Sequence, residues 1–361
     1  MSADALSQEA LLTALRQVKD PELGRDIVSL NMVRRLEMAD GVVSVDIVLT
    51  TPACPLRDQI QDDVKAALMA LPGVKEVNIN LQANVASDGR IRGSLQLPVK
   101  NAVAVASGKG GVGKTTVAVN LAVALAKEGA AVGLLDADIY GPNVPTMLGV
   151  DRLPPFQGEK LKPAEAFGVK VMSIGFLVPQ GKPLIWRGPM LHSAIRQFLS
   201  DVAWGELDYL IIDLPPGTGD APLSLAQSIP LTGAVIVTLP QAVSVEDAAR
   251  SLEMFRELNV PVLGVIENMS YLELPDGSRM DVFGQGGGEK LAQKAGVPFL
   301  GSIPMDPVVR IGGDHGSPVV VAKPDAAPAK ALMDIARRLA AQISVAALQA
   351  ERPVPKIEIT G

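Results

Sequence analysis

The chain has 361 residues and a formal net charge of −6, with 48% hydrophobic and 20% charged residues. The length favours two domains over one, and the acidic balance argues against a general nucleic-acid binder, which usually has a basic surplus. The single cysteine, Cys54, excludes an intrachain disulfide. Without a basic signal-peptide start or an apolar run of roughly 18 residues, we expect a cytoplasmic protein that binds neither membrane nor nucleic acid.

Residues 1–85 are predicted to form a small α+β domain. The apolar spacing at 7–18 and 56–71 predicts two helices, the second stopped by a Pro-Gly pair. Residues 42–49 and 74–81 are rich in valine and isoleucine and predict two strands. Helices and strands of this length suffice for one small core.

Cys54 lies between the strand at 42–49 and the helix that begins near residue 56. A helix N-terminus favours the thiolate form of a nearby cysteine. Pro55 and the acidic Asp58 leave the net effect open. A functional thiolate and a buried, inert thiol therefore remain alternatives for Cys54.

Residues 108–116 read Gly-Lys-Gly-Gly-Val-Gly-Lys-Thr-Thr, which contains the Gly-x4-Gly-Lys-Thr pattern of phosphate-binding loops. An apolar run at 101–107 predicts a strand before it, and residues 117–127 predict a helix after it. Glycines let consecutive N–H groups turn toward a phosphate, and the helix N-terminus adds its dipole. Lys114 is expected to contact phosphates and Thr115 to bind Mg²⁺; a simple glycine-rich turn is the alternative. The predicted nucleotide-binding residues here are Gly108, Lys109, Gly110, Gly111, Val112, Gly113, Lys114, Thr115 and Thr116.

Two later apolar runs end in aspartates. The run at 131–136 ends in Asp136, with Asp138 two positions on, and the run at 209–213 ends in Asp213. Carboxylates at the carboxyl ends of parallel strands border the ligand crevice. We predict that Asp136 and Asp213 bind Mg²⁺ together with Thr115, and that Asp138 and Lys114 act in catalysis. An ordinary exposed turn is the alternative for the Asp-x-Asp pair.

Strands and helices alternate through the rest of the chain, which predicts an α/β fold with a doubly wound, mainly parallel sheet. Further strands are predicted at 233–239, 261–266 and 299–303, and a final helix at 329–348. Ser244 is expected to be the N-cap of the intervening helix. These elements define an ATPase domain at 101–350, preceded by a linker at 86–100 and followed by a C-terminal tail at 351–361.

Two loops at predicted strand ends suggest how a nucleotide is sensed and selected. Residues 214–220, Leu-Pro-Pro-Gly-Thr-Gly-Asp, are interpreted as a switch loop, or else as a rigid turn. Asn268 follows the strand at 261–266, where its amide is placed to contact adenine; a capping role is the alternative. Because the chain has no Asn-Lys-x-Asp guanine-reading motif there, ATP is favoured over GTP.

These motifs resemble one family. With Lys109, the loop is similar to the deviant P-loop of the family that contains the nitrogenase iron protein, MinD and ParA. Within that family the chain most resembles the Mrp/ApbC-type iron–sulfur carrier ATPases, and its first segment resembles the small domain of iron–sulfur assembly factors. The segments that carry the resemblance are 134–143, 186–190, 212–220, 266–270 and 299–304, with Asp20-Pro-Glu22 and 51–56 in the first domain.

The resemblance implies a homodimeric ATPase that binds iron–sulfur clusters and transfers them to apo-proteins or assembly partners. It also implies that Lys109 reaches the nucleotide of the partner subunit as a catalytic cation. Relatives usually have Cys-x-x-Cys soon after Glu-Asn-Met-Ser, whereas Leu274 and Gly277 stand at those positions here. Cys54 is then the only thiol available to an iron–sulfur cluster, and a cluster-free nucleotide-dependent switch or scaffold for partner proteins is the alternative.

Overall fold

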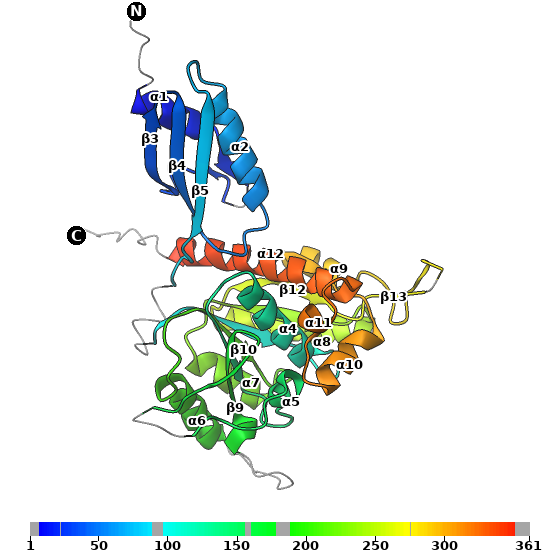
Figure 1. The fold of residues 1–361 in the computed structure, drawn as a ribbon. Helices are drawn as coiled ribbons and strands as arrows, with labels where there is room; N and C mark the ends of the chain where they lie inside the picture. The colour runs from blue at the N-terminus through cyan, green and yellow to red at the C-terminus, as the bar shows by residue number, and fades with distance from the viewer. Residues whose placement is uncertain are drawn as a thin grey trace, which may run out of the picture. The chain divides into compact units, whose positions relative to one another are not determined.

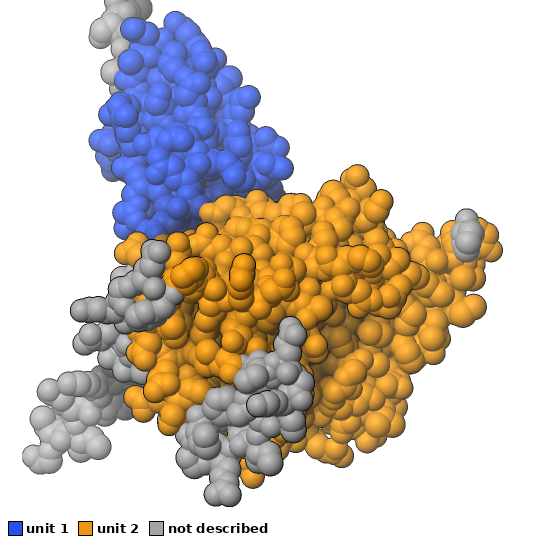
Figure 2. All heavy atoms as spheres, turned by 60° about the horizontal axis from the view of Figure 1, so that its bottom comes forward, with its two compact units in different colours: residues 1–86 blue, residues 87–361 orange. Residues whose placement is uncertain are grey.

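The computed structural model describes residues 7–21, 23–88, 97–155, 160–177, 188–274 and 276–350, without the side chains of 188–192 and 350. The chain divides into two compact units, residues 1–86 and 87–361 (Figure 2). Each unit has a hydrophobic core of its own. None of the helices in the described ranges is long and apolar enough to cross a membrane.

The first unit is the predicted small α+β fold. Alternate residues of β4 are buried, and they face a helix whose buried positions recur every four residues, Ile60, Val64 and Leu68. β3 and β4 pair antiparallel, whereas β4 and β5 pair parallel because α2 connects them. The elements are α1 (Gln8–Leu15), β1 (Lys19–Asp20), β2 (Arg25–Asp26), β3 (Val33–Ala39), β4 (Val42–Leu49), α2 (Arg57–Met69) and β5 (Glu76–Ala83).

The second unit is built on an eight-stranded sheet in the order β15-β12-β11-β6-β10-β7-β9-β8 (Figure 1). Every neighbouring pair is parallel except β8 with β9. The central strands are buried on both faces, as their continuous apolar runs require. The strands are β6 (Val99–Ala106), β7 (Val132–Asp136), β8 (Ala164–Ala166), β9 (Val169–Ser173), β10 (Leu207–Asp213), β11 (Gly233–Thr238), β12 (Val262–Glu267) and β15 (Phe299–Ser302), with a separate hairpin of β13 (Leu272–Glu273) and β14 (Arg279–Met280).

Helices cover both faces of this sheet (Figure 1), so the predicted doubly wound, mainly parallel α/β fold is confirmed. On one face, α4 packs against α11 and α12; the other group includes the contacting pairs α6–α7 and α8–α9. The helices are α4 (Lys114–Lys127), α5 (Val144–Leu148), the short 3₁₀ helix η1 (Ile174–Leu177), α6 (Gly188–Ser200), α7 (Asp220–Ser228), α8 (Ala242–Glu257), α9 (Gly287–Ala295), α10 (Pro307–Asp314), α11 (Val319–Ala322) and α12 (Ala327–Ala350).

The prediction that Ser244 caps a helix is wrong. α8 begins at Ala242, and Gln241 is its N-cap residue. Ser244 therefore lies inside the first turn, where it is buried and its hydroxyl accepts the backbone N–H of Leu239 at 3.1 Å. The side chain fastens the end of β11 to α8, a tertiary contact that the local capping pattern does not reveal.

Candidate nucleotide-binding site

The loop at residues 108–116 joins β6 to α4 and offers a row of backbone donors. Gly111 and Gly113 have φ angles of +82° and +81°, a left-handed conformation that glycine adopts without steric cost. Within the described chain, the backbone N–H groups of residues 110–115 donate to no protein acceptor. The N-terminus of α4 begins at Lys114. Free N–H groups at a helix N-terminus are what an anionic phosphate requires, so the loop fits that ligand.

Lys114, Thr115 and Asp213 form a compact polar cluster beside the loop. The Lys114 ammonium donates to Asp213 Oδ1 at 2.7 Å, and the Thr115 hydroxyl donates to Asp213 Oδ2 at 2.7 Å. Lys114 and Asp213 are both buried. Burial raises the pKa of Asp213, while the neighbouring Lys114 charge and the hydrogen bonds that it accepts lower it. The cluster therefore places a buried ammonium group next to a hydroxyl and a carboxylate, whose oxygens are of the kind that bind Mg²⁺.

Asp136 lies at the end of β7, in register with Asp213 at the end of the neighbouring β10. Its carboxylate accepts from the Ser173 hydroxyl at 2.8 Å and from the backbone N–H groups of Asp138 and Val144. Burial, reinforced by the charge of Asp213, raises the pKa of Asp136 to about 8. Two acids placed this closely favour a cation between or beside them.

The remaining predicted catalytic residues lie at the rim of this cluster. The Asp138 carboxylate is 3.6 Å from the Lys114 ammonium and is nearly buried. Lys109 is half-buried, its carbonyl accepts the Ser107 hydroxyl at 3.0 Å, and its ammonium forms no ion pair with any residue in the described ranges. Among the described residues, Lys109 therefore has an ammonium group without a counter-charge.

Asn268 contacts the loop directly, although it is far away in sequence. Its amide donates to the Val112 carbonyl at 2.8 Å, and a Cβ on Gly113 would lie only 2.3 Å from the same amide nitrogen. The preceding residue, Glu267, is buried and accepts from the Ser270 hydroxyl and the Gly288 N–H. The end of β12 is therefore pinned on one side to the phosphate loop and on the other to α9.

The residues considered for iron–sulfur chemistry lie elsewhere. Cys54 belongs to the first unit, where it is half-buried against the core. Leu274 and Gly277 lie in the β13–β14 hairpin. Among the described residues, no group of three His, Cys, Asp or Glu side chains is placed to hold a metal ion. Glu22 and residues 186–187 lie outside the described residues, as do the side chains of 188–190.

Two contributors to the site were missed by sequence reasoning. Ser173 holds Asp136 from the end of β9, a strand that was not predicted; its alternating Val169-Lys-Val-Met-Ser173 pattern is the signal that was available. Glu267 is the last residue of β12, one position beyond the strand predicted at 261–266. An acid closing a fully apolar strand is the same signal that identified Asp213, and it applies equally to Glu267.

Comparisons with known proteins agree with this geometry. A family model described as the NUBPL iron-transfer P-loop NTPase matches residues 98–340, and one described as an iron–sulfur cluster assembly protein matches residues 8–81. The iron–sulfur cluster carrier protein of Synechocystis is 54% identical over 354 residues, which cover 95% of this chain and 99% of that protein.

Two solved structures share the fold of the second unit. The nucleotide-binding protein of Archaeoglobus fulgidus, solved in complex with ADP, is 42% identical with a TM-score of 0.54, covering 64% of this chain and 92% of that one. The cell division ATPase MinD of Pyrococcus furiosus is 26% identical with a TM-score of 0.53, covering 66% and 97%. Both likenesses rest on the unit that contains the phosphate loop.

Proposed function

Because the chain belongs to the family of iron-transfer P-loop NTPases and iron–sulfur cluster carrier proteins, we propose that it binds and hydrolyses ATP and uses the nucleotide to control the transfer of iron–sulfur clusters to apo-proteins. The observation that carries the ATPase proposal is the cluster of Lys114, Thr115 and Asp213, joined by two 2.7 Å hydrogen bonds beside a loop with free N–H groups. Residues 101–350 would carry this activity, and residues 1–85 would serve cluster assembly.

Each residue of the cluster has a distinct part in the proposed reaction. Lys114 would exchange Asp213 for the phosphates, which leaves the Asp213 carboxylate free. Mg²⁺ would then be held by Thr115, Asp136 and Asp213, whose oxygens are the ligands it prefers, and it would offset the phosphate charge. Asp138 would orient the attacking water from its position next to Lys114. Asn268 would select adenine after releasing Val112.

Lys109 supports a homodimeric arrangement. Its ammonium has no counter-charge within the described chain, and it lies in the loop that would hold the phosphates. In a homodimer it would enter the site of the partner subunit and stabilise the charge that develops on the transferred phosphoryl group. This role predicts loss of hydrolysis with retention of ATP binding in Lys109→Ala.

A second function is favoured by one specific observation. The hairpin that would carry cluster ligands has Leu274 and Gly277 at those positions, and neither side chain can bind iron. A cluster-free, nucleotide-dependent switch or scaffold for partner proteins accounts for an intact phosphate loop beside a hairpin without thiols. Iron and sulfide analysis after anaerobic reconstitution separates the two functions.

The ATPase proposal is tested with Lys114→Ala. Removing the buried cation should lower Mg²⁺-dependent ATP turnover by at least about 100-fold, because the developing phosphate charge loses its nearest counter-charge. Lys290→Ala, which removes an exposed lysine from α9, is the matched control and should turn over ATP at the parent rate. Parent-like turnover by Lys114→Ala would refute the assignment of this site.

A further inference from the structure

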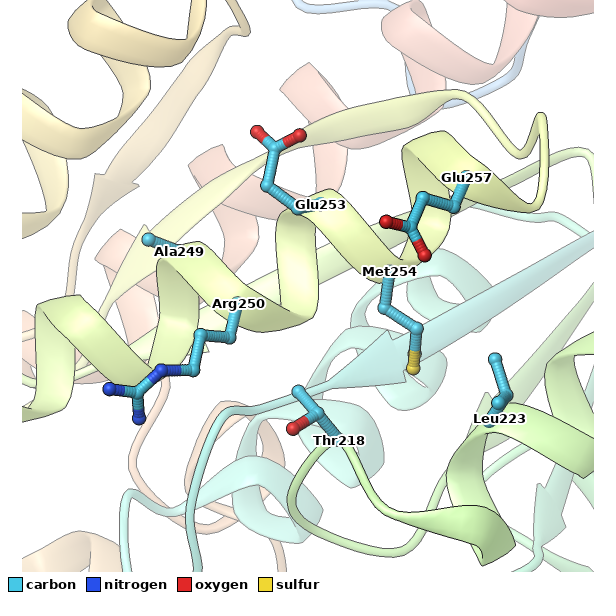
Figure 3. A pocket seen from close by; sticks show the side chains of 7 residues that line it. All are labelled: Thr218, Leu223, Ala249, Arg250, Glu253, Met254 and Glu257. Atoms are coloured by element: carbon cyan, nitrogen blue, oxygen red, sulfur yellow. The ribbon is translucent and has the colours of Figure 1, made fainter.

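Helices α7 and α8 enclose a groove that plays no part in the proposed hydrolysis. It has a volume of about 420 Å³ and is lined by Thr218 of the loop before α7, Leu223 of α7, and Ala249, Arg250, Glu253, Met254 and Glu257 of α8. Met254 extends from α8 toward Leu223 (Figure 3), and the two side chains provide an apolar floor. A second hollow of about 300 Å³ lies at the C-terminal ends of the two helices, where Ala226 of α7 and Leu258, the residue after α8, are among its lining residues.

The charges at the groove are not balanced. Arg250 is paired with Asp247 at 2.7 Å, and Glu253 is paired with Arg256 at 2.8 Å. Glu257 lines the groove beside Met254 (Figure 3), is exposed, and forms no ion pair with any residue that the structure describes. An apolar floor with an uncompensated carboxylate at its edge complements a side-chain pair in which one member is apolar and the other is basic.

Both walls of the groove are attached to the phosphate loop. On the α8 side, Gly108 packs so closely that a Cβ there would lie 2.1 Å from the backbone carbon of Asp247. On the α7 side, the Gly217 N–H donates to the Ser107 carbonyl at 2.8 Å, one residue before Thr218. These contacts at Ser107 and Gly108 provide a route by which a movement at the start of the loop would reach α8 and the segment before α7.

We propose that the groove between α7 and α8 docks a short amphipathic helix of a partner protein, with an apolar side chain on Met254 and Leu223 and a lysine or arginine at Glu257. Ala249 to Glu257 spans about 12 Å of helix at 1.5 Å per residue, which accommodates about two turns of a docked helix. The affinity changes with bound nucleotide because both walls contact the phosphate loop. That coupling rests on the proposed nucleotide binding, whereas the docking itself does not.

The test uses a displayed library of random peptides of about 12 residues, which is longer than the roughly eight helical residues that span 12 Å. The full-length chain is panned without nucleotide, and the enriched peptides are synthesised with a fluorescent label for anisotropy titration. Enriched sequences should place a lysine or arginine three or four positions from a leucine or methionine. Failure to enrich any peptide, or enrichment of acidic peptides, would overturn the proposal.

Two variants locate the binding. Glu257→Lys should weaken peptide binding by at least about 10-fold, since repulsion replaces attraction at that position. Glu165→Lys reverses an exposed acid on β8, an edge strand that does not line the groove, and should leave the affinity unchanged. Ala249→Phe places a bulky side chain at a residue that lines the groove and should also abolish binding; thermal unfolding verifies that both α8 variants remain folded. Peptides that bind all of these proteins equally would contradict the assignment to this groove.

Peptide titrations with and without nucleotide distinguish the docking from the proposed function. ADP with Mg²⁺ should shift the peptide affinity of the parent, whereas Lys114→Ala should bind peptide as the parent does without nucleotide and show no shift. If ADP does not bind the parent, the proposed function fails while the nucleotide-free titration still decides the docking. A self-association constant altered by Glu257→Lys, with peptide binding unaffected, would instead identify the groove as a contact between copies of this chain.

Discussion

Asn268 contacts the phosphate loop through Val112 and lies shortly before the β13–β14 hairpin in the chain. The loop and the hairpin differ in the interactions that stabilise them. The loop is surrounded by buried charged groups from β10 and α4, with Lys114 and Asp213 in direct contact. The hairpin is closed by its own backbone, since Leu274 N–H donates to the Ser278 carbonyl and Gly277 N–H to the Leu274 carbonyl.

The difference shows that the two functions implied by the family are structurally separable. A buried ion pair is costly unless hydrogen bonding satisfies it, and here the Asp213 carboxylate accepts from both Lys114 and Thr115 at 2.7 Å. The hairpin is stabilised by turn geometry and by Arg279, whose guanidinium carbon lies 4.2 Å from the centre of the Tyr271 ring. It therefore keeps its shape without cluster ligands.

The largest expected effect is on iron binding, after two cysteines are introduced into the hairpin. The double substitution Leu274→Cys/Gly277→Cys would supply four cysteines per proposed homodimer, enough for a cubane cluster. Anaerobic reconstitution should raise bound iron from near zero to about four per dimer, with a visible charge-transfer band. Gly277 has a φ of +81°, so its replacement should cost about 1 kcal/mol of stability.

The parent and Cys54→Ser are the controls for that experiment. The parent should bind a cluster weakly or not at all, because a dimer offers only Cys54 and its symmetry mate, and any binding should depend on Cys54. A stable four-iron cluster in Cys54→Ser would mean that ligands other than thiols hold it. Iron content unchanged by the two installed cysteines would show that the hairpin cannot present them to one site.

A pair of glycine variants tests how rigidly the loop side is packed. Gly108→Ala places a methyl group against the backbone of α8, whereas a Cβ on Gly110 meets nothing within 4 Å. Gly108→Ala should lower the free energy of unfolding by about 1–3 kcal/mol, the usual cost of overpacking. Gly110→Ala should be near neutral in chemical denaturation without nucleotide, and equal losses for the two variants would contradict this close packing.

The last prediction concerns the pH dependence of stability. The pKa of Asp136 is raised from 3.8 to about 8 by burial. Between these values the folded chain holds a proton that the unfolded chain releases, so this group makes the parent less stable as pH rises. Asp136→Asn should remove this dependence of the unfolding free energy on pH, which is at most about 1.4 kcal/mol per pH unit.

Denaturation of Asp136→Asn and the parent at pH 5 and pH 8 measures this difference. The stability of the variant relative to the parent should be more favourable at pH 8 than at pH 5. Asn120→Asp places an acid at another buried position of the same unit and serves as the control. Its stability relative to the parent should be less favourable at pH 8 than at pH 5. An Asp136→Asn difference that is independent of pH would mean that Asp136 is ionised in the folded chain.

The sequence by itself determined the family, the doubly wound fold and the phosphate loop, because each depends on local pattern. The apolar runs are buried strands that end at Asp136 and Asp213 as predicted, and at Ala106, one residue before the predicted end at Ser107. The glycines of residues 108–113 predict a loop that needs left-handed backbone, and the structure has it at Gly111 and Gly113. The family follows from the same motifs, and the relatives confirm it.

Tertiary structure alone decided which distant residues meet. Ser173 reaches Asp136 across 37 positions because β9 lies beside β7, and Asn268 reaches Val112 across 156 positions because β12 ends near the loop. Ser244 fastens β11 to α8 where its local pattern indicated a cap. Strand order sets the first two contacts, as well as the groove between α7 and α8, and strand order depends on how helices pack across the whole sheet.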